Sequence, residues 1–358
     1  MTVSGANASG RARSAATGIE RLANEALDLP EFRSECLRRL RSLLAVDAAF
    51  FASVDPVTLL FTSAFAEEPL AQSTPLFLDN EFGRDDVNKF ARLAGSNDTI
   101  GSLDHATQGD RKASARYREV LSPLGLGDEV RMALVSGGWC WGVLCLHRTK
   151  SSRGFDDAEL DALNRLAPYV AQGLRTSIAL FSATPEPLSV DGPGIIILGA
   201  DLSIVSINPQ ARRWLADIED TNWPTHFDLP MPVLAAAAQA AGDGQTAAPP
   251  PTRLRRGQGG WITVHASTLT GTAGNQIAVV LDAAGTPQVS SLILAAHGLT
   301  PAQTRVAALV LQGRSTRSIV DELQISSNTL QEHLHAVFDK LGIGSRRELV
   351  AALSGRPH

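Results

Sequence analysis

Residues 326–341 read SSNTLQEHLHAVFDKL, and Ser326 is a favourable N-cap for a helix over this stretch. Near the N-terminal end of that helix, one face would carry polar side chains that can hydrogen-bond a partner. The opposite face would be an apolar stripe, because apolar residues recur at i, i+4, i+7, i+8 and i+11. These residues are Leu330, Leu334, Val337, Phe338 and Leu341.

Three further short helices are expected around this stretch. Residues 300–303, TPAQ, form a capping box with Pro at the first helical position, so a helix should begin at Pro301 and end at Gly313. Ser315 can cap a second helix, and residues 345–348, SRRE, are a capping box that begins a fourth. A short helix, a tight turn and a polar-faced helix make the plan of a helix-turn-helix.

A set of positions over roughly residues 297–354 has a recognisable spacing: Leu299-Thr300-Pro301, Gly313, Ser315, Ile319, Leu323, Ile325-Ser326, Thr329, His333 and Lys340-Leu341-Gly342. With these residues the stretch resembles the DNA-binding domain of LuxR/GerE-type regulators. The resemblance implies four helices that bind double-stranded DNA as a dimer, with the third helix in the major groove and the fourth often in the dimer contact. Gln303 and Thr304 depart from the acidic residues usual there, and Gln331 departs from the usual Lys.

The candidate DNA contacts lie at the starts of the expected helices and on the polar face of the third. Gln331 suits a bidentate contact to adenine, Glu332 can accept from cytosine N4, and His335 can reach a guanine or a phosphate. The alternative interpretation is an ordinary solvated helix face. The full candidate set is Thr316, Arg317, Ser327, Asn328, Thr329, Gln331, Glu332, His335, Lys340 and Arg346.

The charge distribution sets limits on DNA binding. The net charge of the 358-residue chain is −5, so the chain is not basic as a whole. From residue 291 onward, seven basic residues oppose five acidic ones, and the sign of the net charge reverses. Because few cations are available to phosphates, one copy should bind DNA weakly and with a shallow salt dependence. We therefore expect a homodimer.

The first upstream unit has the pattern of an antiparallel sheet with flanking helices. β-Favouring runs over 131–147 flank Gly137-Gly138, and glycines can take the positive φ of a hairpin turn. A long helix should begin at the cap Asp156. The run Trp141-Gly142-Val143-Leu144, followed by Phe155-Asp156, resembles a GAF domain, which implies a fold that can hold a small ligand. Trp139, Trp141 and Phe155 are candidate cavity residues, although aromatic residues in such strands more often belong to the core.

The second upstream unit also begins and ends with hairpins. Residues 195–207 form one around Gly199, a helix begins at Asn208-Pro209, and residues 261–281 form the closing hairpin. This order of elements resembles a PAS domain. The whole chain is therefore expected to be a multidomain α+β protein, with two antiparallel-sheet sensor domains followed by an all-α four-helix domain. The expected order is a disordered tail at 1–17, a GAF-like domain at 18–182, a linker at 183–193, a PAS-like domain at 188–286 with an insertion at 242–251, a linker at 283–290, and a helix-turn-helix domain at 291–358.

We expect no enzyme, cofactor or metal. The sequence contains no phosphate loop, nucleophile elbow or His-Glu-x-x-His motif, and the three cysteines match no zinc pattern. Cys140 and Cys145 are expected to be buried thiols. Asp85-Asp86 is read as a loop or helix start rather than a phosphorylation site, because no βα alternation surrounds it.

These features favour a cytoplasmic transcriptional regulator that does not enter the membrane. A small-molecule effector and RNA polymerase are candidate partners besides DNA. The alternative is a protein-interaction module, in which the face that carries Gln331 and Glu332 binds another regulator instead of DNA.

Overall fold

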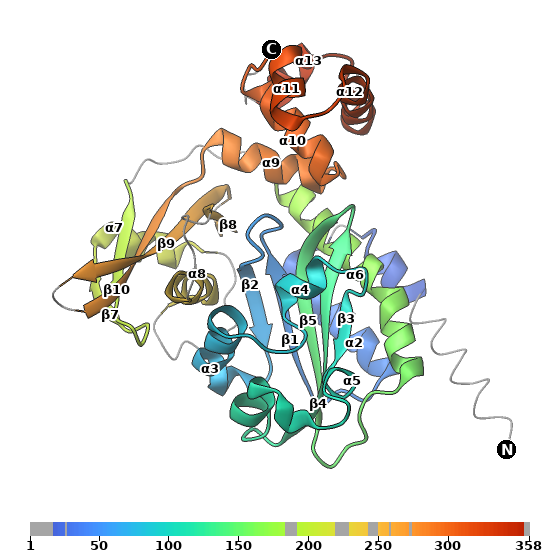
Figure 1. The fold of residues 1–358 in the computed structure, drawn as a ribbon, viewed down its shortest axis with the longest axis vertical. Coiled ribbons are helices and arrows are strands. Elements are labelled where there is room, and N and C mark those ends of the chain that lie inside the picture. Colours follow the sequence, from blue (N-terminus) through green and yellow to red (C-terminus); the bar gives the residue numbers. More distant parts are fainter. Residues whose placement is uncertain are drawn as a thin grey trace, which may run out of the picture.

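The computed structural model describes residues 17–25, 27–182, 192–218, 229–242, 250–257, 259–271 and 274–353. Residues 1–16 of the tail expected over 1–17 lie outside these ranges, whereas Thr17 is helical. Most of the linker at 183–193 and of the insertion at 242–251 also lies outside them. Figure 1 shows two sheets side by side, with the C-terminal helices stacked beyond one end of the first sheet. None of the helices within the described ranges combines the length and apolar character that a membrane span requires.

The first sheet has five antiparallel strands in the order β2-β1-β5-β4-β3. One face packs against the helices α2 (Leu29–Leu43) and α6 (Asp157–Ser182), and the other is covered by short helices (Figure 1). The strands are β1 (Ala48–Val54), β2 (Phe61–Ala66), β3 (Ile100–Ser102), β4 (Leu126–Ser136) and β5 (Trp139–Thr149). The short helices are η1 (Leu70–Ser73), α3 (Thr74–Leu78), η2 (Asp79–Gly83), α4 (Phe90–Ala94), α5 (Leu103–Ala106), η3 (Arg111–Ala113) and η4 (Tyr117–Leu121).

The local signals in this domain are confirmed. Gly137 and Gly138 have φ of 63° and 80° and join β4 to β5 as a hairpin. Asp156 and Glu159 exchange the two hydrogen bonds of a capping box, each 3.0 Å long, at the start of α6. Strand β2 begins only at Phe61, because Leu59 has a φ of 59° and its backbone N–H donates back to Asp55 O in the preceding turn.

The second sheet repeats the strand order of the first, as β7-β6-β10-β9-β8. Asn208 caps its first helix as expected, accepting a hydrogen bond of 2.8 Å from the backbone N–H of Ala211. The predicted opening and closing hairpins are both present. The elements are β6 (Gly194–Leu198), β7 (Ile204–Ile207), α7 (Pro209–Ala216), α8 (Met231–Ala241), β8 (Thr252–Arg255), β9 (Trp261–Gly271) and β10 (Gly274–Ala283).

Helix α8 was not expected from the sequence. Residues 231–238 are all buried, because the helix packs against β9 and β10 on one side and against β2 and η2 of the first domain on the other. A helix enclosed by two domains needs small side chains all round rather than one apolar stripe, and six of those eight side chains are alanine, proline or valine in place of a polar face.

The C-terminal helices are α9 (Thr286–Ala296), α10 (Pro301–Leu311), α11 (Thr316–Leu323), α12 (Ser327–Leu341) and α13 (Arg346–Leu353). The linker expected over 283–290 is wrong in its second half, because α9 begins at Thr286. Leu294 of α9 is buried in the core of the C-terminal helices, whereas Leu292 and Ala295 are buried against the first domain. Helix α9 is therefore a shared structural element and not a flexible connection.

A buried ion pair joins three parts of the chain. Asp55 follows β1, Arg253 lies on β8, and their side chains are 0% and 4% exposed. Arg253 donates to the two Asp55 carboxylate oxygens from Nε (2.7 Å) and Nη2 (2.5 Å), and its backbone N–H adds a third bond of 2.9 Å. Its Nη1 reaches α9, donating to Gln288 O at 2.9 Å and to Ser291 Oγ at 2.7 Å. One guanidinium thus holds the two sheets and α9 together.

We predict that Asp55→Ala lowers the free energy of unfolding by about 3–5 kcal/mol, because it leaves the Arg253 charge buried without its partner. Denaturant unfolding of the full chain would measure this. The control is Asp85→Ala, which removes the exposed ion pair with Arg92 and should cost at most about 1 kcal/mol. Equal losses in the two variants would contradict the role assigned to Asp55.

Candidate nucleic-acid interface and a buried charged cluster

Helices α11 and α12 form the expected helix-turn-helix. Gln324 ends α11 in the left-handed conformation, with φ 53° and ψ 43°, which turns the chain sharply. Ser326 then caps α12, its hydroxyl accepting from the backbone N–H of Thr329 at 3.0 Å. The buried side of α12 carries Leu330, Leu334 and Val337, as predicted. The remaining caps are also confirmed, at Thr300, Ser315 and Ser345.

The opposite side of α12 is open to solvent. Asn328 donates from Nδ2 to Glu332 Oε1 at 3.0 Å, so these two candidates orient each other one turn apart. The two sheet domains do not cover this face. Its exposed residues are Ser327, Asn328, Gln331, Glu332 and His335.

A second group of candidates meets at the start of α11. Arg346, the first residue of α13, donates from Nη1 to Thr316 Oγ1 at 3.3 Å. Its Nε and Nη2 find no hydrogen-bond partner among the described residues. Arg317 is exposed beside them. Two cations at the positive end of a helix dipole make this a suitable place for a phosphate.

Two candidates are engaged within the protein. The Lys340 Nζ donates to Gly298 O and to Gln303 Oε1, both at 2.8 Å. The hydroxyl of Thr329 lies 2.9 Å from that of the cap Ser326. In this arrangement both side chains support the C-terminal domain, although the Lys340 side chain remains exposed.

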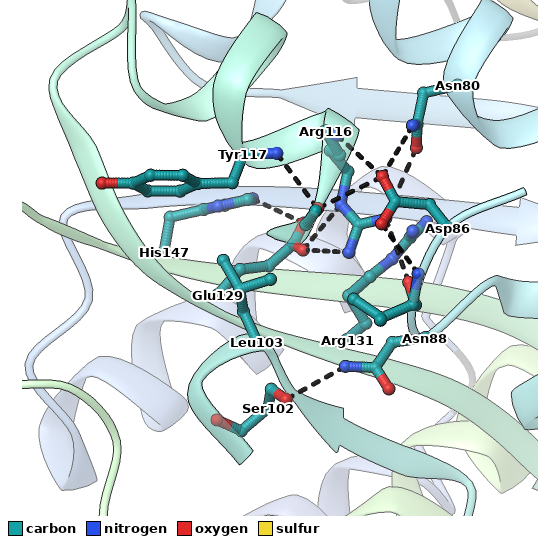
Figure 2. Close-up of polar contacts among 12 residues, drawn as sticks. Asn80, Asp86, Asn88, Ser102, Leu103, Arg116, Tyr117, Glu129, Arg131 and His147 are labelled. Carbon is teal, nitrogen blue, oxygen red and sulfur yellow. Dashed lines mark hydrogen bonds and ion pairs between the residues drawn. The ribbon is translucent and has the colours of Figure 1, made fainter. Parts of the chain in front are cut away.

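A cluster of charged side chains lies between the first sheet and its short helices. Arg116 donates from Nε to Glu129 Oε2 at 2.8 Å, and its backbone N–H donates to Asp86 Oδ2 at 2.7 Å (Figure 2). Arg131, also buried, donates from Nη2 to Glu81 Oε2 at 2.6 Å. These bonds anchor the short helices to β4. We call Glu81, Asp86, Arg116, Glu129, Arg131 and His147 the charged cluster.

Burial and neighbouring charges shift the pKa values in this cluster. Burial lowers the pKa of His147 to about 4, so its imidazole is neutral near pH 7. Burial opposes ionisation of Glu129, but Arg116 and Arg131 outweigh it and hold the pKa of that carboxyl below its usual value. Burial likewise opposes ionisation of Asp86, yet hydrogen bonds from the Arg116 backbone and Asn80 leave its pKa lowered.

A cavity of about 20 Å³ adjoins the charged cluster, with room for about one water molecule. The aromatic residues proposed from sequence do not line it: Trp141 and Phe155 belong to the core on the opposite face of the sheet. The signal that sequence reasoning missed is the pair Glu129 and Arg131, two charges at alternate positions of an apolar strand. The lining residues are Phe50, Leu70, Phe77, Arg116, Val120, Leu121, Glu129, Cys145 and His147.

The distances within the cluster would allow a metal ion, but its charges oppose one. Ligand atoms of Glu129, Cys145 and His147 lie within 4.8 Å of one another. However, Glu129 is already bound by Arg116, and burial raises the pKa of the Cys145 thiol, which keeps it protonated. A cation placed here would also face two buried guanidinium groups. These residues fit a metal poorly.

A larger groove of about 420 Å³ lies between the two sheet domains. Its size is within the usual range for a small-molecule site, and its walls come from both domains. The lining residues are Pro75, Leu76, Asp79, Gly83, Ala200, Asp201, Leu202, Ala238, Ala241 and Gly242.

Two regions of the chain match known families. Residues 297–353 match the family of bacterial regulatory proteins, luxR family, and residues 28–174 match the GAF domain. The chain thus contains a LuxR-family helix-turn-helix domain and a GAF domain.

Relatives in Mycobacterium bovis and Mycobacterium tuberculosis are provisionally named HTH-type transcriptional regulators. They are 28% identical over 217 residues, which cover 58% of this chain and 24% of each relative, so the chain spans about a quarter of their length.

Solved structures are similar only at a low level. The DhaR(N)–DhaL complex of E. coli matches with a TM-score of 0.25 and 13% identity, over 79% of this chain and 91% of that one. The VqmA dimer of Vibrio cholerae matches with a TM-score of 0.19 and 17% identity, over 49% of this chain and 84% of that one. Scores this low support no argument about fold or function.

We predict that Leu334→Asp unfolds the C-terminal domain, because it places an unpaired charge in a fully apolar core. Circular dichroism of the full chain should show a loss of helix. The matched control is His335→Asp, on the exposed side of the same helix, which should retain its helicity. Normal helicity in Leu334→Asp would show that the buried face is misassigned.

We also predict that stability falls as the pH drops from about 6.5 to about 4. In this pH window His147 is protonated in the unfolded chain and neutral in the folded chain. The unfolded state therefore binds more protons and is stabilised relative to the folded state. His147→Gln should reduce this part of the loss. The control His105→Gln, at an exposed histidine, should keep the wild-type profile in denaturant unfolding at each pH. An unchanged profile in His147→Gln would contradict the assignment.

Proposed function

We propose that this chain is a DNA-binding transcriptional regulator, and not an enzyme, in which α12 enters the major groove. The observation that carries the proposal is the two-sided character of α12. One side is buried in a four-helix core, and the other presents exposed hydrogen-bonding side chains directly after a tight helix-helix turn. The match of residues 297–353 to the luxR family supports the same conclusion.

The candidate residues then divide into two roles. Gln331 and Glu332 lie where side chains of a recognition helix contact base edges, as adenine and cytosine partners. Arg317, Thr316 and Arg346 lie together at the start of α11, where they would contact phosphates and fix the position of the domain on the duplex.

A homodimer is part of the proposal. With seven basic against five acidic residues from residue 291 on, a single domain offers little net attraction to DNA. Val350 on α13 is 38% exposed, which leaves an apolar side chain of the fourth helix available for a second copy.

The two sheet domains are proposed to be sensors. The second sheet has the same strand order as the first and a helix packed on one face, which supports the PAS-like assignment. The groove between the domains could accept a small-molecule effector. We place the regulator in the cytoplasm, with RNA polymerase as a further candidate partner.

One observation favours the alternative, a protein-interaction module. The exposed face of α12 carries Glu332 and no Lys or Arg, which is unusual for a surface that approaches phosphates. On this alternative, the same face would bind another regulator.

Fluorescence anisotropy of labelled duplexes from upstream of this protein's own gene tests the proposal, with the full chain as titrant. We predict that Arg317→Ala weakens binding to all duplexes alike, and that Gln331→Ala loses about 1–3 kcal/mol of preference for the specific duplex. The controls are Arg212→Ala, at an exposed position on α7, and Gln312→Ala, at an exposed position after α10. Both variants should bind DNA with unchanged affinity. Wild-type affinity in both test variants would favour the interaction module.

A further inference from the structure

Two consecutive carbonyl groups before α10 are bound by different parts of the protein. The indole N–H of Trp139, at the start of β5, donates to Leu299 O at 2.8 Å. The ammonium of Lys340, at the end of α12, donates to Gly298 O at 2.8 Å. A single peptide segment therefore connects the GAF domain to the last turn of the proposed recognition helix.

The hairpin between β4 and β5 fits closely against this segment, and in Figure 1 α9 and α10 lie beyond its end of the sheet. A Cβ atom added to Gly138 would lie 3.1 Å from Pro301 Cδ, the first residue of α10. Gly298 has a φ of 88°, and a Cβ there would lie 3.2 Å from Arg175 Nη1 of α6. Glycines at both positions allow the two domains to approach.

The strands that carry this contact also carry the charged cluster. Glu129 and Arg131 lie on β4, and His147 lies on β5 with Trp139 at the other end of the same strand. The two strands pair from the cluster to the hairpin turn, with a register shift between Leu134 and Val135, so a change at the cluster can be passed along this ladder to the hairpin.

We propose that Trp139, Gly298 and Leu299 form a latch that holds the helix-turn-helix domain in a docked state on the GAF domain. The proposal rests on the DNA-binding function proposed above and specifies how it is regulated. The exposed face of α12 stays uncovered, so the latch does not act by blocking that face. It acts by fixing the orientation of the domain.

Release of the latch would change the geometry of DNA binding. The domain could reorient to place two copies on successive half-sites, which a fixed docking does not permit for every spacing. An effector that binds the sensor domains more tightly in the undocked state would then shift the population toward the DNA-binding form.

The test is Trp139→Phe in the full chain, which keeps an aromatic ring at the hairpin and removes the N–H donor together with the second ring of the indole. We expect faster amide hydrogen exchange over residues 297–303. We also expect DNA affinity to rise about three- to tenfold, the range that one net hydrogen bond supplies.

The control is Trp214→Phe, which removes an indole N–H bond of 3.0 Å to Gly192 O in the second domain. It should leave both the exchange over 297–303 and the DNA affinity unchanged. Because the exchange measurement needs no DNA, it decides on docking even if the chain binds no duplex.

The outcomes separate the two proposals. Unchanged exchange over 297–303 in Trp139→Phe would overturn the latch. Faster exchange with equal or weaker DNA binding would overturn its inhibitory role. Failure of both wild type and Trp139→Phe to bind any duplex would instead overturn the DNA-binding function.

Discussion

The ion pair between Asp55 and Arg253 is the interaction on which the arrangement of the domains depends. Arg253 belongs to the second domain, and its guanidinium bonds reach the first domain and α9 at once. Removing two charges from water is costly, and their attraction offsets this cost only when every donor finds an acceptor. A misplaced domain would leave a charge buried and unpaired. The pair therefore contributes more to the choice of one arrangement than to stability as such.

Helix α9 turns this arrangement into a constraint on the C-terminal domain. Its residues Leu292 and Leu294 are buried in two different hydrophobic cores, so the helix cannot rotate without disturbing one of them. The Trp139 bond to Leu299 O adds a second attachment one turn beyond the helix. The helix-turn-helix domain is therefore held at two points, through α9 and through the Trp139 bond. A regulatory signal needs to weaken only the smaller of these contacts, the Trp139 bond.

The charged cluster gives the GAF domain a polar interior, although apolar side chains would cost less free energy to bury. Arg116, Glu129 and Arg131 are buried, and their bonds position helices that cover the sheet. Because such pairs are sensitive to any change in geometry or protonation, the same residues that close this face also make it responsive. Their location on β4, together with His147 on β5, connects that response to the hairpin that contacts α10.

The sequence by itself determined the elements whose signals are local. Caps at Thr300, Ser315 and Ser326, the turn at Gly137-Gly138 and the apolar stripe of α12 each depend on residues within a few positions of one another, so pattern and geometry agree. Most of the exposed face of α12 followed from the same periodicity. Only the tertiary structure decided what depends on distant partners: that α8 is a buried helix between domains, that α9 replaces a linker, and that Lys340 is bound to Gly298. These features are fixed by packing and pairing between segments far apart in the chain, and no local pattern records which segments will meet.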